Sequence, residues 1–84
     1  KGRALSESMS PLINPGDLLT VKKTKFSSLK KGDIIVFKYS TARKIRVHRI
    51  IKILKDKKMV ITKGDNLDSP DAPVKKSEYL GRVV

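Results

Sequence analysis

The sequence predicts a small all-β domain. Helical periodicity is hard to find along the chain, whereas short runs rich in β-branched residues recur and are bounded by Gly, Pro, Asp and Lys. A chain of 84 residues is also too short to divide its core, because it buries only a little over roughly 60% of its unfolded surface. We therefore expect one domain over residues 1–84, built from strands.

Five strands are expected from these runs: Asp17–Lys22, Asp33–Tyr39, Lys44–Leu54, Lys58–Lys63 and Leu80–Val84. The charged residues Lys55–Lys57 separate the third run from the fourth and predict a hairpin turn. Gly16 and Gly32 each precede an Asp at the start of a run. Glycine supplies unusual backbone angles and Asp can bond nearby amides, so both pairs are predicted strand entrances.

A third Gly-Asp pair, Gly64-Asp65, follows a strand instead of preceding one. It opens the polar loop "GDNLDSPDAP" at residues 64–73, which contains three Asp. Such a loop is either a solvated connector or a place where carboxylates are presented to another group.

The composition is strongly basic, with 20 Lys and Arg against 8 Asp and Glu and a net charge of +12. We expect a positive surface, for which anionic lipid headgroups and nucleic acid are both natural partners. The lysines cluster in predicted turns, so each cluster taken alone is better explained as a solvated turn. Without Cys and with a single His, disulfides are excluded and a structural metal is not expected.

The chain contains no apolar stretch near the ~20 residues that span a bilayer, and no signal peptide begins it. It also begins without Met. We therefore expect a fragment of a longer chain, whose membrane anchor lies upstream of Lys1 and outside this sequence.

The only histidine, His48, lies in the third predicted strand. With a period of two, it shares a face with Arg46, while Ile45 and Val47 share the purely apolar opposite face. The alternation slips at Arg49, which predicts a bulge or an edge. By position alone, a single His in a strand is most often structural.

The loop "SESMSPLINPGD" at residues 6–17 is crowded with hydroxyl groups. A serine attacks a carbonyl only when a base removes its proton and donors receive the oxyanion, so Ser6 and Ser8 taken alone are equally good turn formers. Read in order, however, the chain offers a hydroxyl loop, a strand with the sole His and a loop rich in carboxylates. One small β domain thus contains the three residue types of a Ser-His-Asp catalytic set.

Five segments in register resemble the type I signal peptidases, in their archaeal and endoplasmic reticulum branch. "SESMSP" is similar to the nucleophile box, "NPGDLLTV" to the segment after it and "KKGDIIVFK" to the next strand. "RVHRII" resembles the segment that carries His in this branch and Lys in the bacterial one. "ITKGDNLDSPD" resembles the Gly-Asp-Asn box with a second Asp six residues after the first. The resemblance covers nearly the whole chain.

The resemblance implies a role for each matching residue. Ser8 is the nucleophile, Ser6 helps the nucleophile's backbone N–H to hold the oxyanion, and His48 is the general base. Asp65 and Asp71 are the two acidic positions; we expect Asp71 to orient His48 with Asp65 supporting it, and the reverse assignment stays open. Two further residues depart from the family pattern: Asp68 has no counterpart, and Ser10 stands where the branch commonly has Glu.

The resemblance also implies the fold and the substrate. The fold is a small catalytic β-domain, a partly open barrel of short antiparallel strands. The substrate is the signal peptide of an exported preprotein, bound extended between the segments Arg3–Leu5 and Lys44–Val47 and cut after a small residue. The chemistry needs no metal or cofactor. The domain would be membrane-anchored on the extracytoplasmic or endoplasmic reticulum lumenal side. There its lysines would be attracted to anionic lipid headgroups, which would help to hold it at the membrane.

Two other functions compete with this one. A basic β-barrel that binds nucleic acid would explain the charge, but single-strand binding uses aromatic platforms, and of the four Phe and Tyr only Phe37 and Tyr39 share a strand face. We therefore expect no nucleic acid partner. A self-cleaving repressor-type domain also pairs a Ser-Met loop with a base on a later strand, but it uses Lys where His48 stands. An inactive relative is a further alternative.

Overall fold

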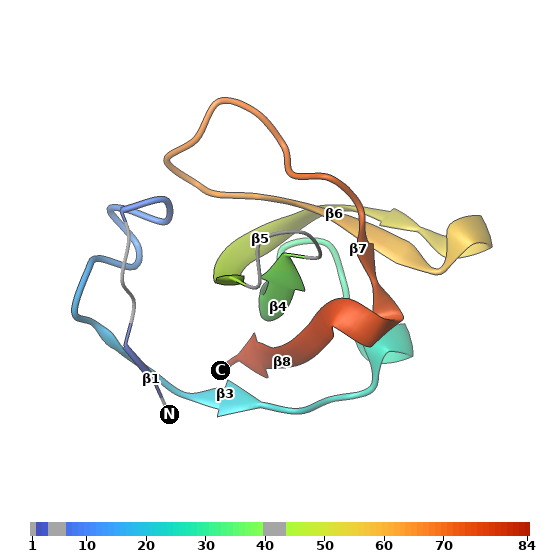
Figure 1. Cartoon of the computed structure of the whole chain (residues 1–84), viewed down its shortest axis with the longest axis horizontal. Coiled ribbons are helices and arrows are strands. Elements are labelled where there is room, and N and C mark those ends of the chain that lie inside the picture. Colours follow the sequence, from blue (N-terminus) through green and yellow to red (C-terminus); the bar gives the residue numbers. More distant parts are fainter. Residues whose placement is uncertain (1, 4–6, 40–43) are drawn as a thin grey trace.

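The computed structural model describes residues 2–3, 7–39 and 44–84, which form strands and short 3-10 turns without an α-helix in those ranges. The prediction of an all-β domain is confirmed. Six strands make one antiparallel sheet that curls around the molecule without closing into a barrel (Figure 1). Within the described ranges, no helix is long and apolar enough to cross a membrane.

The sheet has the order β3-β8-β4-β5-β6-β7, and a separate two-stranded sheet pairs β1 with β2. The strands are β1 (Gly2–Arg3), β2 (Leu18–Leu19), β3 (Val21–Lys22), β4 (Ile34–Tyr39), β5 (Lys44–Leu54), β6 (Met59–Lys63), β7 (Val74–Lys75) and β8 (Tyr79–Val83). The 3-10 turns are η1 (Phe26–Ser28), η2 (Lys55–Lys57) and η3 (Lys76–Glu78).

The five predicted strands correspond closely to observed ones. The run Lys44–Leu54 is β5 without change, and the expected turn between it and the next strand is η2. The run Asp17–Lys22 divides into β2 and β3, which belong to different sheets. Strands β1 and β7 were not predicted, because each has only two residues and leaves no periodic signal. Gly16 and Gly32 adopt φ angles of +89° and +98°, as expected of strand entrances.

The face of β5 that carries His48 is the buried one. His48 is 3% exposed and pairs across the sheet with the fully buried Ile35, whereas Ile45 on the opposite face is 63% exposed. The alternation of side chains between the two faces was predicted correctly, but the sequence did not show which of the two faces would be buried. The curl of the sheet encloses the His48 face, so burial there follows from the fold and not from local hydrophobicity.

Two apolar clusters hold the curled sheet together. The larger one consists of Leu29, Ile35, Phe37, Ile50, Val60, Val74 and Tyr79, and the smaller one of Met9, Ile13 and Leu19. The smaller cluster anchors the N-terminal loop to the outer side of the sheet, since Val47 and Ile34 of the central strands pack against it.

A bulge divides β5 in two. The register shifts between Ile50 and Lys52, just after Arg49, the position at which the sequence alternation slips. Residues 44–49 pair with β4, and β6 pairs only with the part of β5 from Arg49 onward. The first half of β5 therefore has β4 on one edge and is not paired with β6 on the other.

Candidate active site

The loop that carries Ser8 is held in place by its neighbours. Met9 is 1% exposed and Ile13 is 7% exposed, and both belong to the smaller apolar cluster. The amide of Ser10 donates to the carbonyl of Glu7 at 2.9 Å, and the amide of Ile13 donates to the carbonyl of Met9 at 2.9 Å. Ser8 therefore lies in a hydrogen-bonded turn, directly before the buried side chain of Met9.

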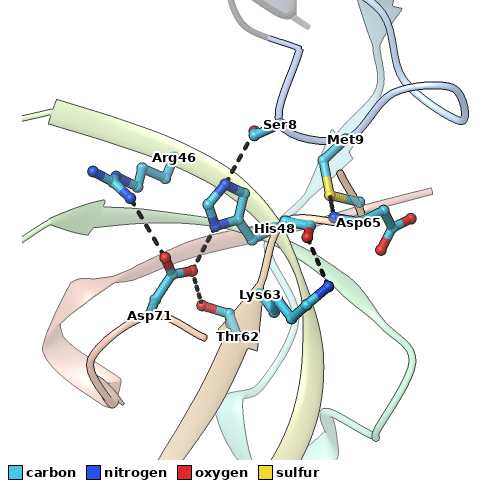
Figure 2. Close-up of polar contacts among 9 residues, drawn as sticks. Ser8, Met9, Arg46, His48, Thr62, Lys63, Asp65 and Asp71 are labelled. Atoms are coloured by element: carbon cyan, nitrogen blue, oxygen red, sulfur yellow. Dashed lines mark hydrogen bonds and ion pairs between the residues drawn. The ribbon is translucent and has the colours of Figure 1, made fainter. Parts of the chain in front are cut away.

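The loop after β6 forms hydrogen bonds to this turn. The amide of Asn66 donates to the carbonyl of Ser8 at 2.8 Å, and the amide of Asp65 donates to Met9 Sδ at 3.2 Å (Figure 2). Gly64 allows the close approach, because a Cβ at this position would lie 2.7 Å from the Ser8 carbonyl oxygen. The position of Ser8 thus depends on a segment more than fifty residues away in sequence.

Ser8, His48 and Asp71 form a continuous chain of hydrogen bonds (Figure 2). Ser8 Oγ lies 3.0 Å from His48 Nε2, and His48 Nδ1 lies 2.5 Å from Asp71 Oδ2. A carboxylate can only accept a hydrogen bond, so Nδ1 carries the hydrogen in this contact. The lone pair of a neutral imidazole then faces the Ser8 hydroxyl, an arrangement that can take up its proton.

The Asp71 carboxylate is itself fixed by two further side chains. Thr62 Oγ1 donates to Asp71 Oδ2 at 2.7 Å, and Arg46 Nη1 lies 3.4 Å from Asp71 Oδ1. The Asp71 amide also donates to the carbonyl of Thr62 at 2.8 Å. The Arg46 guanidinium lies over the Tyr39 ring, 3.9 Å from its centroid. With its side chain 6% exposed, Asp71 is thus a buried acceptor surrounded by donors.

Asp65 has a different partner. Its carboxylate accepts two hydrogen bonds of 3.0 Å from Arg49, whose Nη1 also donates to the carbonyl of Gly32 at 2.9 Å. The hydrogen bonds from Arg49 hold the pKa of Asp65 below its ordinary value, and the same contact raises the pKa of Arg49. This bidentate pair ties the loop after β6 to β5 and to the entrance of β4.

The structure therefore brings together three of the predicted site residues, Ser8, His48 and Asp71, and pairs Asp65 with Arg49. Ser6 lies outside the described residues. Asp68 is exposed, and Ser10 donates to the Asn14 side chain at 2.9 Å. Across the described ranges, His, Asp and Glu side chains do not gather in groups of three that could hold a metal ion.

Thr62 and Arg46 were not singled out from the sequence. A signal for Thr62 existed, because strand alternation places it on the same face as Val60, and a buried hydroxyl needs a hydrogen-bond partner. Arg46 shares a face with His48, but nothing in the sequence shows that the loop after β6 returns to that face.

The Arg49–Asp65 pair predicts a modest, pH-dependent contribution to stability. Because the folded pKa of Asp65 lies below the ordinary value of 3.8, the contribution is present above about pH 4 and is lost as the pH falls through the folded pKa. The two side chains are 33% and 27% exposed, so water screens them and we expect about 0.5–1 kcal/mol at most.

The measurement is urea unfolding of Asp65→Asn beside the unchanged chain. The variant should have the lower free energy of unfolding at pH 7, and the difference should shrink as the pH falls below about 4. Asp68→Asn, an exposed Asp of the same loop, serves as the control and should be neutral. A difference that persists unchanged at acidic pH would contradict the ion-pair explanation.

Comparison with known proteins identifies the family of the chain. The Peptidase S24-like family model matches residues 3–84. Signal peptidase I W of Bacillus subtilis is 41% identical over 85 residues, which cover 92% of this chain and 44% of the relative. The signal peptidase complex catalytic subunit SEC11 of Clavispora lusitaniae is 35% identical over 82 residues, covering 93% of this chain and 49% of the relative. The human catalytic subunit SEC11C is 39% identical over 70 residues, 80% of this chain and 36% of the relative.

The chain therefore belongs to the Peptidase S24-like family, among the type I signal peptidases. It spans less than half the length of these curated relatives. No solved structure matches it.

Proposed function

We propose that the chain is the catalytic domain of a serine endopeptidase that removes signal peptides from exported preproteins. The observation that carries the proposal is the hydrogen-bonded chain from Ser8 through His48 to Asp71, built on three segments that are distant in sequence. The relatives named signal peptidase support the choice of substrate.

The reaction begins when Ser8 Oγ attacks the carbonyl carbon of the scissile peptide and its proton passes to His48 Nε2. The protonated imidazole then donates this proton to the leaving amine, which leaves an acyl ester on Ser8. In the second half, His48 takes a proton from water, the hydroxide attacks the ester, and Ser8 recovers its proton as the acyl product departs. Asp71 holds the required tautomer and stabilises the imidazolium.

The oxyanion of each tetrahedral intermediate would be held by the Ser8 backbone N–H and the Ser6 hydroxyl, as in the family that the sequence resembles. An extended substrate can add to the edge of β5 along residues 44–48, which β6 does not cover. Of the expected second neighbour, Arg3–Leu5, Arg3 lies in β1 and residues 4–5 are outside the described residues. This mode of binding would bring the scissile carbonyl beside His48.

The location follows from the same proposal. We place the domain at a membrane surface, on the extracytoplasmic or endoplasmic reticulum lumenal side, held there by an anchor outside this sequence. Each lysine close to an anionic bilayer contributes on the order of 1 kcal/mol to the free energy of membrane binding. The net charge of +12 would therefore favour this attachment.

The experiment that tests the function is preprotein cleavage in membranes from cells that produce the chain or its variants. Processing that depends on both Ser8 and His48 supports a Ser-His peptidase. Substantial processing by a His48→Ala variant would show that His48 is not the general base. The lysines would then be the remaining candidates for the base.

Thr62 should act as a positioning residue in this reaction. Thr62→Val keeps the shape of the side chain but removes the 2.7 Å hydrogen bond to Asp71, so kcat should fall about tenfold, the equivalent of one hydrogen bond to a charged group. KM should change little, because Thr62 is buried away from the substrate, and Thr62→Ser should restore most of the activity. A merely structural role would instead lower Tm in the Val variant and leave kcat unchanged.

A further inference from the structure

A second concave site lies at the end of the domain opposite to the Ser8 loop. In Figure 1 the turn η1 and the tip of the β5–β6 hairpin lie at one side of the molecule, and the loop that carries Ser8 lies at the other. A cavity of about 1030 Å³ opens between η1, this hairpin and η3. Its volume is at the upper end of the range for ligand sites, so it can receive several side chains of a partner.

The floor of this groove is apolar. It is formed by Phe26, Leu29, Ile53, Leu54, Met59 and Val60. Leu29 and Val60 belong to the larger core cluster, and the Phe26 ring meets the Tyr79 ring edge-on at 5.7 Å. Part of the floor therefore belongs to the packed core, so its shape is set by the fold. Burying such a surface favours binding by roughly 25 cal/mol per Å² of apolar area.

The charged residues around the groove are all basic. They are Lys25, Lys30, Lys31, Lys55, Lys58 and Lys76, and no carboxylate is among the lining residues that the structure describes. These lysines come from three separate parts of the chain: the segment around η1, the β5–β6 hairpin and η3. Like charges around a low-dielectric floor reinforce one another, so the groove is a site of strongly positive potential.

We propose that this groove binds an acidic segment of a partner protein that presents large apolar side chains. The ligand must supply both negative charge for the rim and apolar surface for the floor. A polypeptide can place several carboxylates against lysines that surround the floor on separate elements. A single phospholipid carries its charge in one headgroup, so a lipid could match this rim only as several headgroups together with an acyl chain placed in the groove. Single-stranded nucleic acid stacks on aromatic rings, and Phe26 is the one aromatic residue among the described residues that line the groove.

The test uses three labelled peptides of about 12 residues each, long enough to cross the groove when extended. The probe alternates Glu with Leu and Phe. In the first control Gln replaces Glu, and in the second Ser replaces Leu and Phe. Fluorescence anisotropy with the full chain should show binding of the probe, and at least about tenfold weaker binding of each control, because the groove requires both properties. Amide signals of the lining residues should shift in heteronuclear NMR spectra.

Two double variants locate the site. Lys30→Glu with Lys58→Glu reverses the charge on two parts of the rim and should weaken binding of the probe at least about tenfold. Lys38→Glu with Lys52→Glu makes the same change of net charge at exposed strand positions outside the groove and should have a much smaller effect. None of these four residues belongs to the site around Ser8, so preprotein cleavage should be retained.

Several outcomes would overturn the proposal. Equal binding of the probe and the Ser control would show that the peptide is attracted to the positive protein in general and not to the groove. Equal losses of binding in the two double variants would also show that the binding is nonspecific. Failure of the probe to bind, together with groove-dependent binding to vesicles rich in anionic phospholipid, would identify a lipid surface instead. Groove-dependent binding of an oligonucleotide in place of the probe would identify a nucleic acid site. These results are independent of whether Ser8 and His48 prove to be catalytic.

Discussion

Replacing either Ser8 or His48 by alanine should reduce preprotein cleavage by a factor of at least about 10⁴, because the remaining residue cannot complete the proton transfer. The hydroxyl and the imidazole face each other at 3.0 Å, so each is useful only with the other. The double variant should therefore be little worse than either single one. The measurement is the rate of preprotein processing in membranes from cells that produce the three variants.

The identity of the base gives this prediction a further check. His48 Nε2 faces the Ser8 hydroxyl at 3.0 Å, so His48 is the group placed to accept the Ser8 proton. His48→Lys should not restore cleavage, because the longer lysine side chain places its nitrogen elsewhere and is charged at neutral pH unless strongly desolvated. Additive losses in the double variant would show that Ser8 and His48 do not act as a unit.

Asp71→Asn should be the next most damaging substitution, with a loss of up to roughly 10⁴ in rate. An amide at this position can donate to His48 Nδ1, which favours the tautomer whose hydrogen faces Ser8 and removes the acceptor that the nucleophile needs. The kcat of preprotein cleavage should fall while the fold, checked by circular dichroism, remains.

Asp68→Asn is the matched control for this prediction. It makes the same chemical change three residues away, at an exposed position of the same loop, and should leave the rate nearly unchanged. Equal and minor losses from both substitutions would mean that the loop is a connector and that the contact between Asp71 and His48 has no part in catalysis.

The sequence predicted the strands wherever a local signal was strong. The eleven residues of β5 were predicted with correct ends, because a long β-branched run is bounded by turn residues on both sides. The two-residue strands β1 and β7 were missed, because their pairing depends on neighbours far away in the chain. Alternation correctly grouped the residues of β5 by face, but it did not show which face the curl of the sheet would enclose.

For the site, the sequence by itself determined the inventory: a hydroxyl loop, one histidine in a strand and a loop with three carboxylates. Only the tertiary structure decided which carboxylate meets the histidine. Asp65 and Asp71 are equivalent in composition and loop context, but the chain after β6 returns so that the Asp71 amide bonds to Thr62 of the same strand, and this contact directs its carboxylate to His48. Asp65 lies beside Arg49 instead, because the bulge in β5 and the close packing of Gly64 against Ser8 set the path of the loop at that point. Distances across the sheet are set by long-range pairing, and this information is absent from any local segment of the sequence.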